Sequence, residues 1–507
     1  MRILIGQRSL LLLILRLASS FLGFLGLFLI TNFLGAAVYG SIAFVFSLLA
    51  AFSSFCDLGF NQAHIKKLSE GQDEEGCLST FIIVKLALTG IMVLVTAISL
   101  LTWIYLMGGS IDAEAENLIV LFMLYNIFLS FSSIVTTTYY AKMEIVKTQI
   151  VILTENFARI IMISIVVFGG GGAIQVALAY VLASIAMMVV ALVLLLRDKF
   201  RWKKPTFFRT YVKFALPLAF VAIVTTISAN IDKIIIGFYY SNEAVAYYSS
   251  SQVFINSIAV VGASVAALTY PSFSSWHSQG KIEGIRLSTL MAERYLFMFG
   301  LPITLLFILF PSEIAVALFG SEFAPAGETM RWLSIAMFLI LINTVHTSQV
   351  NAVNRPDLTA KLTFLQFFVF LILLVLLVPD SFLGLGGLGL SYLGAALASM
   401  ISALVLFVAT RFVVKKLTGT SFNPRLLLHL FAAAVTAVIL LLFDQLVPID
   451  NLMILLLYVI LSLELFALAL YMLRELTSED FRYLEEVFNP SKLWRYSFDE
   501  MKGKDKK

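Results

Sequence analysis

The sequence predicts an all-α integral membrane protein with fourteen transmembrane helices, and its composition is the first reason. Of the 507 residues, 60% are hydrophobic and only 13% are charged, whereas soluble domains hold about 25% charged residues. The mean hydropathy of the chain is +0.96. The apolar stretches are continuous and do not alternate with a period of two, a pattern that is typical of membrane helices and not of a membrane β-barrel.

The apolar stretches set the expected positions of the helices. About 20 mostly apolar residues cross the hydrocarbon core of a bilayer as a helix. Fourteen stretches reach that length, at roughly 10–34, 40–63, 79–106, 118–140, 149–168, 174–196, 213–238, 245–271, 292–318, 329–351, 359–378, 388–412, 426–446 and 452–473. The first stretch has no small-residue cleavage site, so we expect an uncleaved membrane helix there and not a signal peptide.

The positive charges lie in alternate connections between the predicted helices. Lys and Arg occur at both ends of the chain and in the connections around residues 66–67, 142–147, 197–213, 281–286, 355–361 and 411–425. The remaining connections carry no Lys or Arg. Because cytoplasmic loops of membrane proteins are enriched in these residues, the pattern predicts a multi-pass protein of the cell membrane with both termini in the cytoplasm. Topology therefore explains the net charge of +4, and no nucleic-acid partner is expected.

The two halves of the chain resemble each other weakly. "AAVYGS" at 36–41 aligns with "EAVAYY" at 243–248, and the glycine run at 169–172 aligns with the one at 384–389. Each half holds six helices, so we expect two parallel repeats related by an axis along the membrane normal, with a central site between them. The expected parts are an N-terminal six-helix bundle (1–200), a C-terminal six-helix bundle (201–418), an extra helix pair (419–474) and a basic amphipathic cytoplasmic tail (475–507). Chance similarity between apolar segments is the alternative.

A few charged residues lie within the predicted helices. They are Arg16, Glu155, Arg159, Asp232, Lys233 and Glu464. A charge near the bilayer centre costs a few kcal/mol, so it normally faces protein or a wet cavity. Glu155 and Arg159 are spaced i, i+4 and can pair on one helix face, whereas Arg16 has no acid in its own helix. An excess of cations favours an anionic ligand, because Arg suits the oxygens of a phosphate and Lys acts as a point charge.

Structural roles can also account for several of these charges. Glu155 and Arg159 fit a buried structural ion pair as well as a coupling site, and Asp232 and Lys233 fit a structural pair less well because their side chains point 100° apart on a helix. Glu464 fits either a helix-packing acid or part of a proton path. Two further cations, Lys85 and Arg331, lie close enough to helix ends to reach the membrane interface.

Polar side chains form stripes on three of the predicted helices. The stripes comprise Asn126, Ser130, Ser133 and Thr137; Thr226, Asn230 and Lys233; and Asn343, Thr347 and Asn351. At 100° per residue, each set shares one face of a continuous helix. Together with the charges, the stripes favour a water-filled cavity that these residues line. The alternative is that they form hydrogen bonds between packed helices.

The sequence lacks the usual signatures of catalysis and of cofactor binding. Walker A, GxGxxG, HExxH and GxSxG motifs are absent. The four histidines, His64, His277, His346 and His429, are scattered without metal-ligand spacing. The cytoplasmic connections are also too short for an ATPase domain. We therefore expect a transporter and not an enzyme, without a metal or cofactor, and the sequence does not decide whether Na⁺ or H⁺ drives it.

Three stretches resemble the polysaccharide (O-antigen or Wzx-type) flippase family of the multidrug/oligosaccharidyl-lipid/polysaccharide (MOP) exporter superfamily. They are "FCDLGFNQAHIKKLSEG" (55–71), "ANIDKIIIGFYYSNEAVAYYSSSQVF" (229–254) and "NAVNRPDLTAK" (351–361). The resemblance implies two six-helix bundles in a V shape around a cavity, followed by a helix pair. It also implies flipping of a polyprenyl-phosphate- or diphosphate-linked glycan from the cytoplasmic to the outer leaflet, for cell-surface polysaccharide assembly.

The same resemblance implies a substrate site and a set of partners. Family members line the cavity with Arg, Lys and Asp, and the corresponding positions here are Arg16, Arg159, Lys233 and Asp232. The implied partners are the lipid-linked glycan, the bilayer and other membrane proteins of polysaccharide assembly. Two alternatives stay open: a cation-coupled multidrug antiporter of the same superfamily, and a membrane scaffold that transports nothing.

Overall fold

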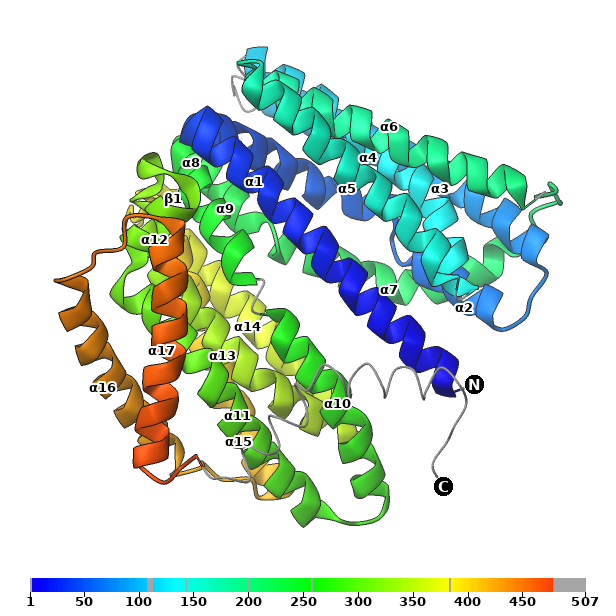
Figure 1. Cartoon of the computed structure of the whole chain (residues 1–507). Helices are drawn as coiled ribbons and strands as arrows, with labels where there is room; N and C mark the ends of the chain where they lie inside the picture. Colours follow the sequence, from blue (N-terminus) through cyan, green and yellow to red (C-terminus); the bar gives the residue numbers. More distant parts are fainter. Residues whose placement is uncertain are drawn as a thin grey trace. The chain divides into compact units, whose positions relative to one another are not determined.

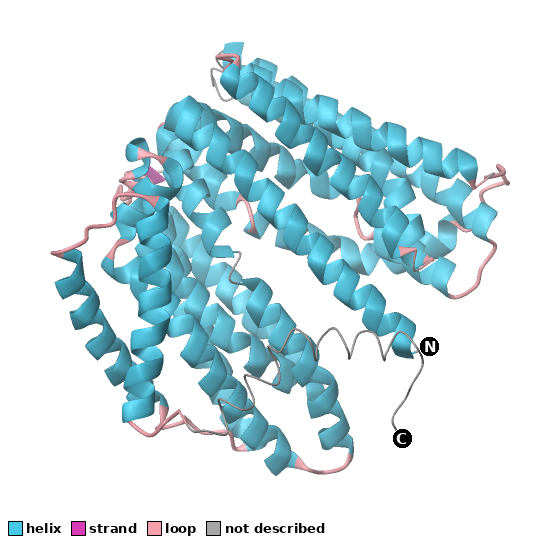
Figure 2. Ribbon diagram, viewed as in Figure 1, coloured by secondary structure: helices cyan, strands magenta, loops and turns pink. Residues whose placement is uncertain are grey.

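The computed structural model is helical along almost the whole described chain. It describes residues 2–106, 113–142, 144–198, 200–256, 259–382 and 384–476, and within the helices some side chains, including that of Arg16, lie outside the description. The described strands are β1 (Ser381–Phe382) and β2 (Leu385–Gly386), which form a small antiparallel hairpin (Figure 2). The predicted all-α membrane fold is confirmed. The predicted tail at 475–507 falls almost entirely outside the described residues.

The chain divides into two compact units, with the boundary between Phe238 and Tyr239 (Figure 1). The helices of the first unit are α1 (Arg2–Ser53), η1 (Ser54–Cys56), α2 (Phe60–Ser69), α3 (Glu74–Leu106), α4 (Ala113–Ala141), α5 (Ile145–Phe168), α6 (Ala173–Arg197), α7 (Phe208–Ser228) and α8 (Ile231–Tyr239). Those of the second unit are α9 (Asn242–Asn256), α10 (Ala259–Ser278), α11 (Ile282–Leu309), α12 (Pro311–Phe319), η2 (Ser321–Phe323), α13 (Ala326–Ala352), α14 (Pro356–Leu377), α15 (Ser391–Thr418), α16 (Leu426–Asp444) and α17 (Leu452–Met472). The boundaries predicted at 200/201, 418/419 and 474/475 stay predictions.

Among the described residues, eleven helices are long and apolar enough to cross a membrane, or twelve if the bent pair α7–α8 is one span. One of the eleven, Ala18–Cys56, has 39 residues, about 60 Å at 1.5 Å per residue. That is twice the thickness of a hydrocarbon core of about 30 Å. Its helix is interrupted at Gly35, whose φ of 85° suits a residue without a Cβ. The break lies between the predicted stretches 10–34 and 40–63, and the predicted count of fourteen helices stays a prediction.

Small residues bring the helices of the first unit close together. α6 packs along α4 and α5, and α5 packs along α1. Ala173, Ala177 and Ala183 of α6 are at most 4% exposed, and such small side chains allow helix backbones to approach each other in a membrane. Larger apolar side chains, among them Phe122 of α4 and Ile163 of α5, fill the remaining space of this core.

α13 is the central helix of the second unit. It packs against α9, α10, α11, α12, α14 and α15. α15 in turn crosses the end of α14 closely, because a Cβ on Gly394 would lie 2.6 Å from the carbonyl oxygen of Leu377. Tyr240, at the beginning of this unit, donates its hydroxyl to the carbonyl oxygen of Val378 at 2.8 Å. The helix that carries the polar stripe of Asn343 is therefore surrounded by protein on most sides.

The helix predicted over 213–238 is bent in the structure. The structure ends α7 at Ser228, begins α8 at Ile231, and bends the chain by 45° between them. Polar side chains at the bend bond to their own backbone: Ser228 Oγ donates to the carbonyl oxygen of Val224 at 2.6 Å, and Asn230 Nδ2 donates to that of Thr226 at 2.9 Å. Such bonds compete with the regular helix ladder and commonly accompany bends.

Candidate functional site

Arg159 of α5 lies in a cluster of polar and aromatic side chains in the first unit. Its Nη1 atom is 3.2 Å from Glu155 Oε1, and its Nη2 atom donates to Asn156 Oδ1 at 2.8 Å. The guanidinium carbon lies 5.1 Å from the ring centroid of Tyr180 on α6, within the range of a cation–π interaction. The predicted i, i+4 pair is therefore present, and three neighbours fix the orientation of the guanidinium.

Aromatic rings surround this ion pair. Tyr125 and Tyr180 contact each other edge to face with ring centroids 5.5 Å apart, and Phe46 and Phe122 pack against both. The side chains of the pair are 17% exposed for Arg159 and 9% exposed for its acid. A charge pair in apolar surroundings is screened little by water. The cluster offers a positioned guanidinium whose charge is balanced by the acid next to it.

Asp232 and Lys233 lie at the bend between α7 and α8. Asp232 is 2% exposed, and its Oδ1 atom accepts the backbone N–H of Lys233 at 2.8 Å. Lys233 Nζ donates to the carbonyl oxygen of Ala229 at 3.0 Å. An acid is favourable where a helix begins and a cation is favourable where one ends. The two opposite charges therefore each fit one helix end at the bend, a role that a continuous helix does not offer.

The predicted polar stripe of α4 makes hydrogen bonds to α3 and to its own backbone. Ser130 shares a hydrogen bond of 2.7 Å with Thr89 of α3. Ser133 Oγ donates to the carbonyl oxygen of Ser130 at 2.6 Å, and Asn126 Nδ2 donates to a backbone carbonyl of its own helix at 2.9 Å. Thr137 is 8% exposed. That this stripe lines a cavity stays a prediction.

The stripes on α7 and α13 behave in a similar way. Thr226 Oγ1 donates to a carbonyl oxygen one turn earlier on α7 at 2.9 Å. On α13, Asn343 is 5% exposed, Thr347 is half-buried, and Asn351 Oδ1 accepts a hydrogen bond of 2.7 Å from Thr359 of α14. Their role as a cavity lining also stays a prediction.

The two remaining predicted residues are Arg16 and Glu464. Arg16 lies within α1, and its side chain is outside the described residues. Glu464 lies on the exposed face of α17, whereas its neighbours Ser462 and Phe466 are buried on the opposite face. The structure thus brings together Glu155 and Arg159, and separately Asp232 and Lys233.

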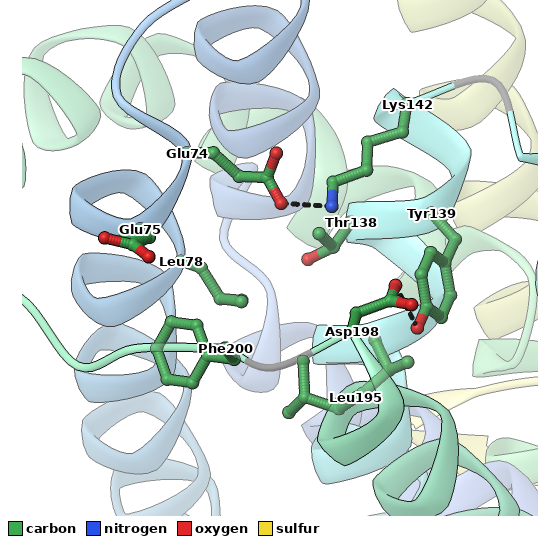
Figure 3. Close-up of a pocket in the computed structure, with 10 residues that line it drawn as sticks. Glu74, Glu75, Leu78, Thr138, Tyr139, Lys142, Leu195, Asp198 and Phe200 are labelled. Carbon is green, nitrogen blue, oxygen red and sulfur yellow. Dashed lines mark hydrogen bonds and ion pairs between the residues drawn. The ribbon is translucent and has the colours of Figure 1, made fainter.

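A cavity of about 200 Å³ lies at the end of the first unit where α3 begins and where α4 and α6 end. It is lined by Glu74, Glu75, Leu78, Val135, Thr138, Tyr139, Lys142, Leu195, Asp198 and Phe200 (Figure 3). Lys142 forms an ion pair with Glu74, and the hydroxyl of Tyr139 donates to Asp198 at 2.9 Å. Ligand pockets commonly measure about 300–1,000 Å³, so this cavity is too small for an oligosaccharide.

The charges at this cavity are paired. Asp198 also forms an ion pair of 3.0 Å with Lys147. Burial by itself would raise the pKa of Asp198, but the hydrogen bonds from Lys147 and Tyr139 hold that pKa below its ordinary value. Beside the cavity, Thr138 bonds to His64 Nε2 at 2.9 Å, and Tyr211 bonds to His64 Nδ1 at 2.7 Å. The network connects α2, α4 and α7 and holds these three helices together.

The comparison with protein families decides the classification. Residues 5–277, more than half of the chain, match the family described as polysaccharide biosynthesis protein. The chain belongs to this family. The family that the sequence resembles is thereby confirmed.

One curated relative and two solved structures are similar to this chain. The probable low-salt glycan biosynthesis flippase Agl15 of Haloferax volcanii is 24% identical over 355 residues, which cover 68% of this chain and 71% of that protein. The fold is similar to that of the lipid II flippase MurJ in its inward closed conformation, with a TM-score of 0.71 and 16% identity, over 92% of this chain and 98% of that chain. It is also similar to an inward-facing multidrug resistance MATE family transporter of the MOP superfamily, with a TM-score of 0.61 and 17% identity, over 81% and 99% of the two chains.

Sequence reasoning missed two features of this polysaccharide biosynthesis protein. Lys85 is buried within the protein: it is 2% exposed, and its Nζ atom donates to the carbonyl oxygen of Cys56 in η1 at 3.0 Å. The second feature is a buried cluster of Glu293, His346 and Arg411 in the second unit. Its signal in the sequence was weak, because the three residues belong to three different predicted helices.

Proposed function

We propose that this family member flips a polyprenyl-phosphate- or diphosphate-linked oligosaccharide from the cytoplasmic to the outer leaflet, by alternating access, for assembly of a surface glycan. The observation that carries the proposal is the family match over residues 5–277. The relative Agl15 is named as a flippase of glycan biosynthesis, which supports the same substrate class. We assign no catalytic step and no cofactor to the chain.

The chemistry of the first unit suits such a substrate. A phosphate group needs a positioned cation, and the Arg159 guanidinium is held by Asn156, Glu155 and Tyr180. An Arg can bind phosphate oxygens through two parallel hydrogen bonds. We propose Arg16 and Lys233 as further cations of the substrate site and Asp232 as the acid that tunes them. The side chain of Lys233 would have to exchange its bond to the Ala229 carbonyl for a substrate oxygen.

The setting of the transporter follows from the same proposal. We propose that both termini face the cytoplasm of the cell membrane, because the basic connections alternate along the chain. The cavity between α3, α4 and α6 then lies at the cytoplasmic end of the first unit. Other membrane proteins of polysaccharide assembly are the proposed partners, since a flipped glycan needs enzymes that supply and consume it.

A multidrug antiporter is the second candidate, because the fold is also similar to a MATE transporter. A pump for cationic drugs needs acids that stay unpaired in the membrane. In the described part of the first unit, Glu155 is paired with Arg159, and Asp232 accepts the backbone N–H of Lys233. The ion pair of Glu155 favours the flippase.

Flipping of a labelled lipid-linked oligosaccharide in proteoliposomes tests the proposal. The fluorophore sits on the glycan, and a membrane-impermeant quencher reports the fraction in the outer leaflet over time. We expect wild-type protein to expose the inner-leaflet pool, and Arg159→Ala to slow flipping by at least about tenfold, the value of one charge-assisted contact. Arg355→Ala is the matched control, because Arg355 also pairs with an acid, Asp357, but lies exposed in a connection.

The two candidate functions give different results in this assay. Efflux of a cationic dye without any flipping of the glycolipid would support the antiporter instead. Equal flipping by wild type, Arg159→Ala and protein-free vesicles would overturn the flippase proposal.

A further inference from the structure

Three ionisable side chains from three helices meet inside the second unit. Glu293 of α11 is fully buried, and its Oε1 atom lies 3.0 Å from His346 Nε2 of α13 and 2.5 Å from an Nη2 atom of Arg411 on α15. The histidine is also fully buried, and the side chain of Arg411 is 15% exposed. One carboxylate oxygen thus contacts both the imidazole and the guanidinium, and the other oxygen is left over.

Several polar atoms of this cluster have no hydrogen-bond partner among the described residues. They include Glu293 Oε2, His346 Nδ1 and Arg411 Nη1. Two acceptor atoms on α13 are in the same condition, Asn343 Oδ1 and Gln349 Oε1. Asn343, His346 and Gln349 are spaced three residues apart, so they follow one another along one side of the helix. Three buried polar atoms without a partner among the described residues therefore lie along the side of α13 that carries His346.

A buried polar atom without a partner is unfavourable, and a site made only for stability would satisfy it. The atoms left over on α11 and α13 can each accept a hydrogen bond, whereas Arg411 Nη1 is a donor. A metal ion fits poorly, because Arg411 already occupies the carboxylate with its positive charge. A proton fits, because His346 Nδ1 and Glu293 Oε2 can each accept one. Imidazole is also the side chain that most readily changes its charge near neutral pH.

We propose that Glu293, His346 and Arg411 form a proton-binding site in the second unit, and that proton exchange there is coupled to transport. With His346 neutral, the charges of Glu293 and Arg411 cancel. Protonation of His346 at Nδ1 changes the cluster to a net charge of +1 in apolar surroundings, where charge interactions are strong. The free energy of packing α11, α13 and α15 together therefore differs between the neutral and the protonated state of His346. The coupling rests on the proposed flippase function, whereas the proton site itself does not.

A second set of polar contacts begins at Gln349, three residues after His346 on α13. Gln349 Nε2 donates to Thr418 Oγ1 at 2.7 Å and to Thr420 Oγ1 at 2.9 Å, and these two hydroxyls are 2.9 Å apart. Thr420 lies just after α15, in a connection predicted to be cytoplasmic. Thr420 is 1% exposed and Thr418 is 8% exposed, so these polar contacts continue the buried polar side of α13 toward the end of α15.

The other helices packed on α13 bring no charged contact to the cluster among the described residues. α10 meets this part of α13 through apolar residues such as Phe273. α9 and α12 pack near the beginning of α13, at its opposite end, where Ser251 donates to the carbonyl oxygen of Ala326. The charged residues and histidine on α9, α10, α12 and α14 are Glu243, His277, Glu313, Asp357 and Lys361.

The helices packed on α11 and α15 carry their own charges. Arg294, next to Glu293, is engaged by Glu475, with Nε 2.7 Å from Oε1. His429 of α16 contacts the ring of Phe297 and not the cluster. Lys415 and Lys416 of α15 are exposed, as is Glu464 of α17. The charges that face His346 directly are therefore those of Glu293 and Arg411.

Proton binding is measured first without any substrate. Full-length protein in detergent is titrated over the pH range in which it stays folded, and the protons taken up per chain are counted. We expect His346→Gln to take up about one proton fewer than wild type. Gln keeps a donor for Glu293, and Glu293→Gln is a second variant in case the first does not fold. Equal proton uptake by wild type and these variants would overturn the site.

Coupling is measured in proteoliposomes with the glycolipid assay. If one proton exchanges per transport cycle, a pH gradient of one unit shifts the distribution of substrate between the leaflets by about tenfold. We expect this shift for wild type and for the control His277→Gln, and its loss in His346→Gln, which still equilibrates the substrate. A full shift in His346→Gln would overturn the coupling. Absence of flipping in every protein would count against the flippase proposal, while the titration still decides the proton site.

Discussion

The Nζ atom of Lys233 lies 3.0 Å from the carbonyl oxygen of Ala229, so a side chain of α8 closes the last turn of α7 across the bend. On the other side of the bend, Asp232 accepts a backbone N–H in the first turn of α8. Each charge thus stabilises the helix end of opposite polarity. The break between α7 and α8 explains why two opposite charges occur in an apolar stretch. Lys233 can bind the substrate only after its Nζ atom leaves the carbonyl oxygen of Ala229.

Replacement of Lys233 separates these two roles. Lys233→Gln removes the charge, and we expect the free energy of unfolding to fall by about 0.3–1 kcal/mol, the range for a cation at a helix end. Denaturant unfolding of the detergent-solubilised protein measures it, with Lys361→Gln as the control at an exposed lysine. Unchanged stability together with lost flipping would show that Lys233 acts on the substrate and not on the bend.

The ion pair of Glu155 and Arg159 should be strongly coupled. Removing either partner leaves the other charge buried, so Glu155→Gln and Arg159→Met are each expected to lower the free energy of unfolding by about 3–5 kcal/mol. The double variant should cost clearly less than the sum of the two, because it leaves no unpaired charge.

An exposed pair of the same chain is the control for this cycle. Glu283 and Arg286 are 3.5 Å apart with 66% and 39% of their side chains exposed, and such pairs contribute about 0–1 kcal/mol. If the effects of Glu155→Gln and Arg159→Met on the free energy of unfolding were also additive within about 0.5 kcal/mol, the aromatic surroundings would not strengthen the buried pair.

The sequence was informative about features that depend on composition along the chain. The helical membrane fold follows from long apolar stretches, and the break in α1 at Gly35 lies where one predicted stretch ends and the next begins. The bend between α7 and α8 could not be read in this way, because mean hydropathy is the same for a straight helix and for a bent one. Local side-chain bonds at Ser228 and Asn230 accompany it.

Contacts between distant residues account for most of what the sequence left undecided. Glu293, His346 and Arg411 lie far apart in the chain, and only the packing of α11, α13 and α15 brings them together. Lys85 was expected to reach the membrane interface, but its Nζ atom instead binds a backbone carbonyl oxygen, that of Cys56 in η1. No side-chain pattern marks such a carbonyl. By contrast, the pair of Glu155 and Arg159 was predictable because it is local to one helix.

The close contact between Gly237 and Phe44 should not tolerate a larger side chain at position 237. α8 lies so close to α1 that a Cβ at Gly237 would meet the Phe44 ring. We expect Gly237→Ala to lower the free energy of unfolding by about 1–3 kcal/mol, the cost of overpacking, and Phe44→Leu to recover part of the loss in the double variant. Gly90→Ala on α3 is the matched control, since nothing lies within 4 Å of its Cβ position, and it should stabilise the helix slightly. Equal effects of the two substitutions would contradict the close contact.

The bonds of Asp198 to Lys147 and Tyr139 predict a pH dependence of stability. They hold the pKa of Asp198 below its ordinary value although burial acts in the opposite direction. The unfolded pKa is about 3.9, so the stabilisation is fully present above that pH and is lost as the pH falls through the lower folded value. Asp198→Asn should therefore unfold more easily than wild type at pH 7, and the difference should close in acid.

Lys147→Met should reduce the difference between wild type and Asp198→Asn, and so should high salt, because part of the pair is exposed to solvent. Thermal unfolding across the acid range measures both variants, and a gap between wild type and Asp198→Asn that persists undiminished to the lowest pH would show that the carboxylate charge is not the source of the stabilisation.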